Sequence, residues 1–234
     1  MFQMRTLTLP GFAQGCPTPF AAESAGTWIG GIPVDVDPSS PVSRAQFQDI
    51  AARTTDQVSV SPALLELTFE APRSVSVLWA TQSDEIRALL TQALLRAVND
   101  TMQMLDERWV FARRGSGGIA QIDVVDPTAC CVFLHYFDRQ GKPNLHVHVE
   151  VINVVRGSDG QLSGMDVTTY RTAEEVAHEK YTSSLMTELR DLVGVACDIS
   201  YGEDRRSLIE VAGVDPAVIW DLPRVPLAPE GHSS

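Results

Sequence analysis

Polar and apolar residues alternate strictly along residues 145–151, a pattern that predicts a β-strand. In such a strand His146, His148 and Glu150 turn to one face, while the leucine and the valines turn to the other. The preceding run, residues 130–135, is also strand-like, and residues 138–144 between the two runs are rich in turn formers. We therefore predict a β-hairpin with a moderately long connection.

The other patterns predict a single α+β domain. Residues 4–9 and 62–69 are strand-like, and the spacing of Val75, Leu78 and Trp79 indicates a short helix that begins near Ser74. A long helix is predicted from Ser83, where a possible N-cap precedes two acidic residues and a long apolar stripe.

Further along the chain, a capping box at residues 172–175 predicts a helix that ends at Gly194. A short helix from about residue 215 is cut by Pro223. Residues 10–42 show little periodicity and are predicted to be irregular. We therefore expect one domain over residues 1–222 and a Pro-rich tail over residues 223–234.

Three of the five histidines lie in or beside the predicted hairpin. Because His135 is on the first strand, the hairpin can bring it beside His146 and His148. Three neutral imidazoles that converge on one point form a site for a first-row divalent metal. If they were core residues instead, three buried imidazoles would need polar partners that this segment does not obviously supply. We therefore predict a metal site with these three ligands.

The hairpin resembles the third motif of the conjugative relaxases of the TrwC/TraI (MobF) type, in the HUH endonuclease superfamily. That motif has the form H-x-x-S-R-x-x-D-P-x-L-H-T-H-x-x-x-x-N. The matching residues are His135, Arg139, Pro143, Leu145, His146, His148 and Asn153. A second segment, residues 67–80, is similar to the family's D-L-T-F-S-A-P-K-S-V-S-x-L-W-A. Weaker likeness at residues 111–118 and 209–214 extends the resemblance over about residues 28–219.

This resemblance implies a fold and an activity. The implied fold is an antiparallel, palm-like sheet backed by helices, with the three-histidine metal at its centre. The implied reaction is the nicking of single-stranded or hairpin DNA at an origin of transfer during plasmid or integrative-element conjugation. An N-terminal tyrosine attacks the phosphate and becomes joined to the 5′ end. Mg2+ or Mn2+ is the implied functional ion, Zn2+ or Ni2+ are ions that could also bind, and other relaxosome proteins are possible partners.

The carboxylate that such a reaction requires is present in altered form. Glu66 stands where the family has aspartate, and strand alternation places it on one side with Thr68 and Glu70. Its additional methylene moves the carboxylate by roughly 1 Å, a shift that can matter for catalysis. Glu66 is therefore a candidate general base, with a solvated strand-end glutamate as the alternative. Glu150 is a second candidate, either as a base or as a group that orients a ligand imidazole.

The expected nucleophile is missing from its usual place. The four tyrosines, none of which precedes the metal motif, are Tyr136, Tyr170, Tyr181 and Tyr201. Phe20 loosely occupies the N-terminal position, and strand alternation turns Tyr136 away from the metal. Tyr181 follows the motif, loosely as in the replication-initiator branch of the superfamily, and is either a relocated nucleophile or a helix residue packed on the sheet. Cys16 and Thr18 are further candidates.

Two functions therefore remain open. The first is a metal-dependent nickase that uses an unorthodox nucleophile or a water molecule. The second is a nicking-deficient module, derived from a relaxase, that binds DNA or a partner protein.

Charge limits how DNA could bind. The formal net charge is -12, which opposes contact with phosphates. Residues 66–156, which contain both motifs, carry 11 acidic and 9 basic side chains, whereas residues 157–234 carry 14 and 6. The acidity therefore lies mainly in the C-terminal third. The candidate DNA contacts are Arg73, Ser74, Arg113, Arg114, Arg139 and Lys142. An arginine pair such as Arg113 and Arg114 is also common on an ordinary solvated surface.

The remaining sequence features bound the class of protein. The four cysteines lack C-x-x-C spacing, as expected for a protein of the reducing cytoplasm. No signal peptide and no apolar run of membrane-spanning length is present. No Gly-x-x-x-x-Gly-Lys-Ser/Thr loop is present, so we expect no nucleotide partner. We therefore predict a soluble, cytoplasmic protein that does not act at a membrane.

Overall fold

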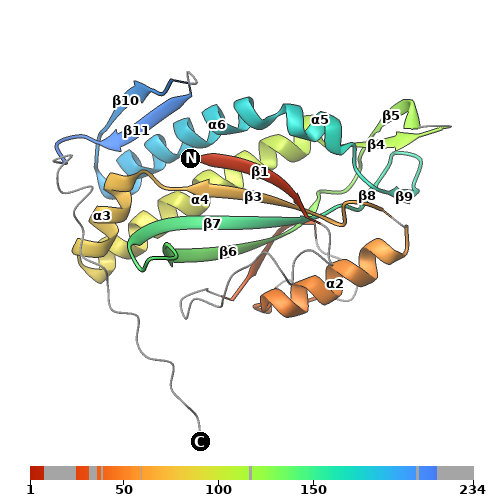
Figure 1. Cartoon of the computed structure of the whole chain (residues 1–234), viewed down its shortest axis with the longest axis horizontal. Coiled ribbons are helices and arrows are strands. Elements are labelled where there is room, and N and C mark those ends of the chain that lie inside the picture. The colour runs from red at the N-terminus through yellow and green to blue at the C-terminus, as the bar shows by residue number, and fades with distance from the viewer. Residues whose placement is uncertain are drawn as a thin grey trace, which may run out of the picture.

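A five-stranded antiparallel sheet forms the centre of the molecule (Figure 1). The computed structural model describes residues 1–7, 25–31, 36–37, 39–58, 60–115, 118–203 and 206–214. Across the sheet, the strands follow the order β1 (Phe2–Leu7), β3 (Leu64–Glu70), β7 (Pro143–Ile152), β6 (Ala129–Phe137) and β2 (Thr27–Gly30). The predicted hairpin is confirmed, because β6 and β7 pair antiparallel with His135 directly opposite His146.

Helices lie on both faces of this sheet, but they cover them unequally. Figure 1 shows α4 (Asp84–Trp109) and α6 (Glu174–Glu188) along one face and α2 (Arg44–Asp56) under part of the other. The shorter helices are α3 (Arg73–Thr81), beside the β6–β7 turn, and α5 (Val167–Thr172), just before α6. A π-helical turn, η2 (Leu189–Val193), continues α6. Of the described helices, α2 is the one on this second face, and it does not extend to the β6–β7 turn (Figure 1).

Three small hairpins surround the sheet. They are formed by β4 (Phe111–Arg114) with β5 (Ala120–Asp123), β8 (Val155–Arg156) with β9 (Leu162–Ser163), and β10 (Cys197–Tyr201) with β11 (Ser207–Val211). In Figure 1 the first two lie at the end of the sheet away from the β6–β7 turn, and the third lies beside α3.

Strand alternation divides the buried side chains into two cores. The larger core lies under α4 and α6 and includes Leu67, Phe69, Val147 and Val149. The smaller core lies under α2, where Phe47 packs with Trp28, Phe133 and Ile152. Because successive residues of a strand face opposite sides, the valines of β7 enter the larger core while its histidines face the side of α2.

The main elements agree with the sequence-based prediction, with several corrections at their boundaries. The predicted strands 4–9 and 62–69 are Phe2–Leu7 and Leu64–Glu70. The irregular segment predicted over 10–42 contains a strand, β2, in its described part. The predicted stop at Gly194 is confirmed by its left-handed φ of 77°. The predicted short helix from residue 215 and the tail 223–234 lie outside the described residues.

The predicted capping box at residues 172–175 is wrong. The hydroxyl of Thr172 donates to the carbonyl of Thr169, and the N-cap residue of α6 is Ala173. The reason is that α5 immediately precedes α6, so Thr172 is already the last residue of a helix. Ser83 does stand at the N-cap of α4 as predicted, but its side chain makes no capping hydrogen bond.

Helix α2 was not predicted, although its signal is present in the sequence. Ser43 and Gln46 form a capping box with both reciprocal hydrogen bonds.

None of the helices that the structure describes combines the length and the apolar character that a membrane span requires.

Candidate metal centre

Three half-buried imidazole rings gather on the sheet face that α2 partly covers, toward the β6–β7 turn. His135 on β6 lies opposite His146 on β7, and His148 follows two residues later on the same face. The ring centres of His135 and His146 are 4.9 Å apart, those of His135 and His148 are also 4.9 Å apart, and those of His146 and His148 are 5.2 Å apart. The predicted convergence of these side chains is therefore confirmed as geometry.

The spacing of the rings fits a shared divalent metal. With metal–nitrogen bonds of about 2.1 Å and angles near 90–110°, three ligand rings would have centres about 4.6–5.3 Å apart. Among the described residues, no three His, Cys, Asp or Glu side chains have their ligand atoms arranged so that they could hold a metal ion without a change of conformation. The planes of His135 and His146 are only 21° apart, so these two rings are stacked. Rotation about χ2, a broad torsion in histidine, is therefore the adjustment that a metal would require.

The surroundings of His146 favour the neutral ring that metal binding needs. Its Nδ1 lies 2.8 Å from the carbonyl of Asn144, so Nδ1–H donates and Nε2 is left as the ligand atom. Burial lowers the pKa of His146 to about 4, and the neighbouring His148 and His135 also lower it, against the opposing effect of the Asn144 carbonyl. At neutral pH this imidazole is therefore uncharged.

Glu66 lies beside the third ring, as strand alternation predicted. Its Oε1 is 3.6 Å from Nδ1 of His148, and Oγ1 of Thr68 is 3.4 Å from the same nitrogen. Glu66 is therefore close enough to influence the orientation of the His148 ring, and the hydroxyl of Thr68 is within hydrogen-bond distance of Nδ1. This arrangement is typical of groups that orient metal ligands.

Glu150 stands on the same face, directly opposite Glu66 across the β3–β7 pair. It is fully buried, and its Oε1 is 2.5 Å from a guanidinium nitrogen of Arg44 on α2. The two carboxylates that the sequence offered thus have different partners: Glu66 adjoins an imidazole, and Glu150 forms a buried ion pair.

Comparison with known proteins agrees with this architecture. The model of the TrwC relaxase family matches residues 20–221. The chain belongs to the TrwC relaxase family. No curated protein matches the sequence.

Solved structures of the conjugative relaxase TrwC have a similar fold. A copper-bound complex with oriT DNA has a TM-score of 0.72 at 23% identity, over 94% of this chain and 78% of that chain. A metal-free complex with oriT DNA has a TM-score of 0.73 at 23% identity, over 94% and 77%. A complex with a 27-mer that comprises the recognition hairpin and the cleavage site has a TM-score of 0.68 at 24% identity, over 94% and 77%. The predicted relaxase-like fold is thus confirmed.

Two tyrosines of this relaxase-family chain lie on the other side of the sheet from the histidines. Tyr181 is buried on α6, where its ring contacts Phe69 edge-on and its hydroxyl donates to the carbonyl of Glu70 at 2.9 Å. Burial raises the pKa of Tyr181 well above its usual value. Tyr136 stacks on Trp79 of α3 and points away from the histidines, the orientation that its strand position predicted. The structure therefore supports the packing alternative for Tyr181.

The N-terminus of α3 is hydrogen-bonded to another part of the protein, so Ser74 is not available as the DNA contact that we predicted. This residue is fully buried, and its backbone N–H and its hydroxyl both donate to the carboxylate of Glu210 on β11. In turn, its hydroxyl accepts from the N–H of Val211. Because Pro72 offers no capping side chain, Glu210 satisfies the helix N-terminus instead. We therefore remove Ser74 from the predicted DNA contacts, while Arg73 remains half-buried beside it.

The basic residues that we predicted as DNA contacts lie at two different ends of the sheet. Arg139 is exposed and Lys142 half-buried in the β6–β7 turn, close in sequence to His135 and His146. By contrast, Arg113 and Arg114 lie on β4, at the far end of the sheet (Figure 1).

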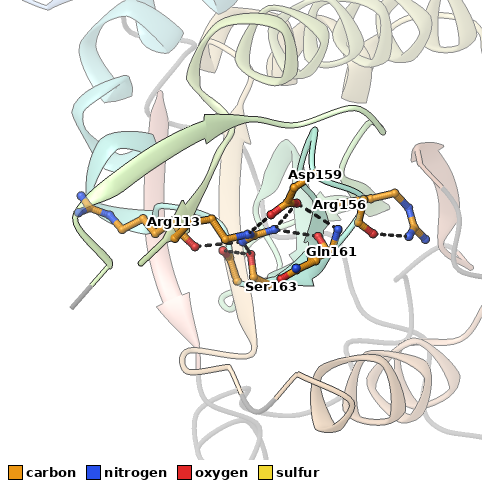
Figure 2. Close-up of polar contacts among 8 residues, drawn as sticks. Arg113, Arg156, Asp159, Gln161 and Ser163 are labelled. Carbon is orange, nitrogen blue, oxygen red and sulfur yellow. Dashed lines mark hydrogen bonds and ion pairs between the residues drawn. The ribbon is translucent and has the colours of Figure 1, made fainter. Parts of the chain in front are cut away.

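The guanidinium groups of β4 are engaged in ion pairs. Arg114 donates twice to Asp159, at 2.7 and 3.0 Å, and also donates to Gln161 and Ser163. Figure 2 shows these contacts, which join β4 to the β8–β9 hairpin. Arg113 forms an ion pair with the buried Asp166 at 2.8 Å. Arg114 therefore joins two hairpins and Arg113 joins β4 to the start of α5, roles that their adjacency alone did not reveal.

Asn153, the last residue of the family motif, is a structural clamp. It is buried, its Nδ2 donates to the carbonyl of Pro62, and its Oδ1 accepts from the N–H of Met165. Its own N–H donates to the carbonyl of Ala63. Asn153 thereby fixes the end of β7 to the segment before β3 and to the segment before α5.

Proposed function

We propose that this chain is a DNA-processing relaxase domain that holds a divalent metal through His135, His146 and His148. The observation that carries the proposal is the gathering of these three rings on one face of the sheet in a TrwC-type fold. Solved TrwC structures occur in copper-bound and metal-free forms, which supports a metal without identifying the native ion. Mg2+ or Mn2+ suits phosphate chemistry, while Zn2+ or Ni2+ suits imidazole ligands.

Single-stranded or hairpin DNA is the proposed substrate, because the similar TrwC structures contain oriT DNA. Arg139 and Lys142 are the best-placed candidates for phosphate contacts, since they lie in the turn beside the histidines and form no ion pair with any described residue. Arg73 is a third candidate. Arg113 and Arg114 remain candidates for a second contact at the far end, where their carboxylate partners reduce the charge they can offer.

The site contributes three actions to strand nicking. A metal bound there would polarise a non-bridging oxygen of the scissile phosphate. The three histidines would hold that ion, and Glu66 would keep the His148 ring in the tautomer that binds it. Glu66 is also the candidate for accepting the proton of the attacking hydroxyl or water. We propose residues 1–222 as this functional unit and residues 223–234 as its tail.

The identity of the nucleophile decides between the two candidate functions, a nickase and a nicking-deficient binding module. None of the four tyrosines precedes the metal motif in the sequence, so a stable 5′ tyrosyl adduct is not expected. If nicking occurs, we expect water to attack and to leave free DNA ends. The second candidate is a nicking-deficient module that binds DNA or a protein partner, and the missing N-terminal tyrosine is the observation that favours it.

Incubation of labelled single-stranded DNA with the protein and Mn2+ tests these alternatives. Free cleaved ends that disappear in His146→Ala would support the water-dependent nickase. Binding without cleavage would support the second candidate. A covalent protein–DNA adduct lost in Tyr181→Phe would show that the nucleophile has moved to α6 and would contradict our account. Phe20→Tyr provides a gain-of-function control, because it restores a hydroxyl at the loosely corresponding N-terminal position.

A further inference from the structure

An ion pair between α2 and β7 stands near the histidines. Arg44 is the first residue of α2, and its guanidinium lies 2.5 Å from Oε1 of Glu150. The same guanidinium lies over the ring of Phe133, 4.6 Å from its centre. Phe133 is the residue of β6 that stands directly opposite His148. The arginine is therefore held in a defined place, one row of the sheet away from a proposed metal ligand.

The position of Arg44 is not explained by the stability of its own helix. A cation at a helix N-terminus faces the positive end of the helix dipole, which is unfavourable. The N-terminus of α2 is already stabilised by the Ser43–Gln46 capping box, and the helix packs through Phe47 and Ala51. The ion pair with Glu150 on β7 is an interaction that favours an arginine at this position.

Glu150, the partner of Arg44, lies close enough to Glu66 for the two carboxylates to repel each other. Glu150 and Glu66 face each other directly across β7 and β3, on the same face as the histidines. Like charges in directly opposed positions repel each other, and they do so more strongly where burial excludes water. A cation that engages one of the two carboxylates removes most of this repulsion. Arg44 engages Glu150, while Glu66 stands 3.6 Å from His148.

We propose that Arg44 is a positioning residue: by engaging Glu150, it leaves Glu66 as the carboxylate that orients the His148 ring. The inference deepens the proposed metal site and rests on that proposed function for its metal readout. The orientation of His148 in the metal-free protein, however, can be measured independently of any metal.

Two single substitutions and their combination test this division of roles. In Arg44→Met the repulsion between the two carboxylates is no longer compensated, so Glu66 is displaced from His148. In Glu150→Gln the guanidinium loses its anionic partner and competes with His148 for Glu66. The double variant Arg44→Met/Glu150→Gln removes both the charge and its counter-charge. We therefore expect both single variants to disturb His148 and the double variant to restore it.

The first readout is the nitrogen-15 shift of the His148 ring in the metal-free protein. The natural chain should show the proton on Nδ1, the single variants should show a larger share on Nε2, and the double variant should return to the natural pattern. The second readout is Mn2+ affinity by calorimetric titration. We expect each single variant to lose about tenfold, in the range for groups that orient metal ligands, and the double variant to recover to within about threefold.

Matched controls separate positioning from general damage. Arg53→Met removes another arginine from the same helix and should leave both readouts unchanged. Arg44→Lys retains the charge, so it should retain the His148 tautomer; if Arg44→Met does not fold, Arg44→Lys and the double variant still test the proposal. An unchanged tautomer in both single variants, or a double variant as impaired as they are, would overturn the inference. Absence of Mn2+ binding by the natural chain, with the tautomer changes intact, would overturn only the proposed metal function.

Discussion

The two ends of β7 organise their polar residues differently. Near the β6–β7 turn, three imidazoles gather on one face of the sheet, and the nearby Arg139 and Lys142 form no ion pair with a described residue. At the opposite end, Asn153 clamps the backbone, and the arginines of β4 form ion pairs with Asp159 and Asp166. The contacts of Asp159 are drawn in Figure 2. The second end thus uses its polar groups for internal structure, whereas Arg139 and Lys142 at the first end have no such described ion pair. The comparison shows that a charged residue near a motif is informative only when its partners are known.

The sharpest test of this contrast is His146→Ala near the β6–β7 turn. Loss of one of three ligands should reduce Mn2+ or Zn2+ affinity by more than the roughly 10- to 100-fold cost of removing an outer partner. Isothermal titration measures this loss, with His178→Gln on α6 as the control that changes a histidine away from this face. Unchanged affinity in His146→Ala would remove the basis of the metal proposal.

At the clamped end, Asn153→Ala should destabilise the fold with little direct effect on the metal ligands. The substitution removes the side-chain partners of the Pro62 carbonyl and of the Met165 N–H, and leaving buried backbone groups unpaired costs about 2–4 kcal/mol in total. Chemical denaturation measures the change in the free energy of unfolding. A stability equal to that of the natural chain would show that Asn153 is not the clamp we describe.

Paired substitutions of basic residues compare the two ends directly for DNA binding. Arg139→Ala/Lys142→Ala should weaken binding to single-stranded DNA and flatten the log–log salt dependence by up to about 1.4 units, since each phosphate contact contributes about 0.7. Arg113→Ala/Arg114→Ala should change that slope less but lower the melting temperature, because it breaks the contacts with Asp159 and Asp166. A larger change of slope in Arg113→Ala/Arg114→Ala than in Arg139→Ala/Lys142→Ala would indicate that DNA contacts the β4 end of the sheet instead.

The smallest expected effect concerns pH and the ion pair at the far end. Hydrogen bonds from Arg114 hold the pKa of Asp159 down at about 2. Because the folded-state pKa lies below the unfolded value of about 3.9, this pair stabilises the fold above pH 4 and loses its contribution as the pH falls toward 2. The difference in melting temperature between the natural chain and Asp159→Asn should therefore be constant from pH 5 to pH 8 and shrink below about pH 4. A difference that grows on acidification would contradict this assignment.

The sequence by itself determined the hairpin, the face of each histidine and the family. Alternation in residues 145–151 is sufficient to place His146 and His148 on one face, because the twofold period of a strand assigns every second residue to the same side. The strand-like run 130–135 and the turn formers at 138–144 add the hairpin and His135. The motif spacing then identified the relaxase family without any knowledge of partners. Helix α2 was equally predictable from its capping box at Ser43 and Gln46, and it was missed because the preceding segment lacks periodicity.

Only the tertiary structure decided which of the candidate residues form hydrogen bonds or ion pairs with residues distant in the sequence. Ser74 meets Glu210, Arg44 meets Glu150 and Arg114 meets Asp159, and the partners in these pairs lie 136, 106 and 45 residues apart in the chain. No local pattern encodes such pairings, because they depend on how separate elements pack and on the high cost of burying an unpaired charge. Local periodicity therefore specified where the histidines point, and long-range packing specified which charged side chains remain to act beside them.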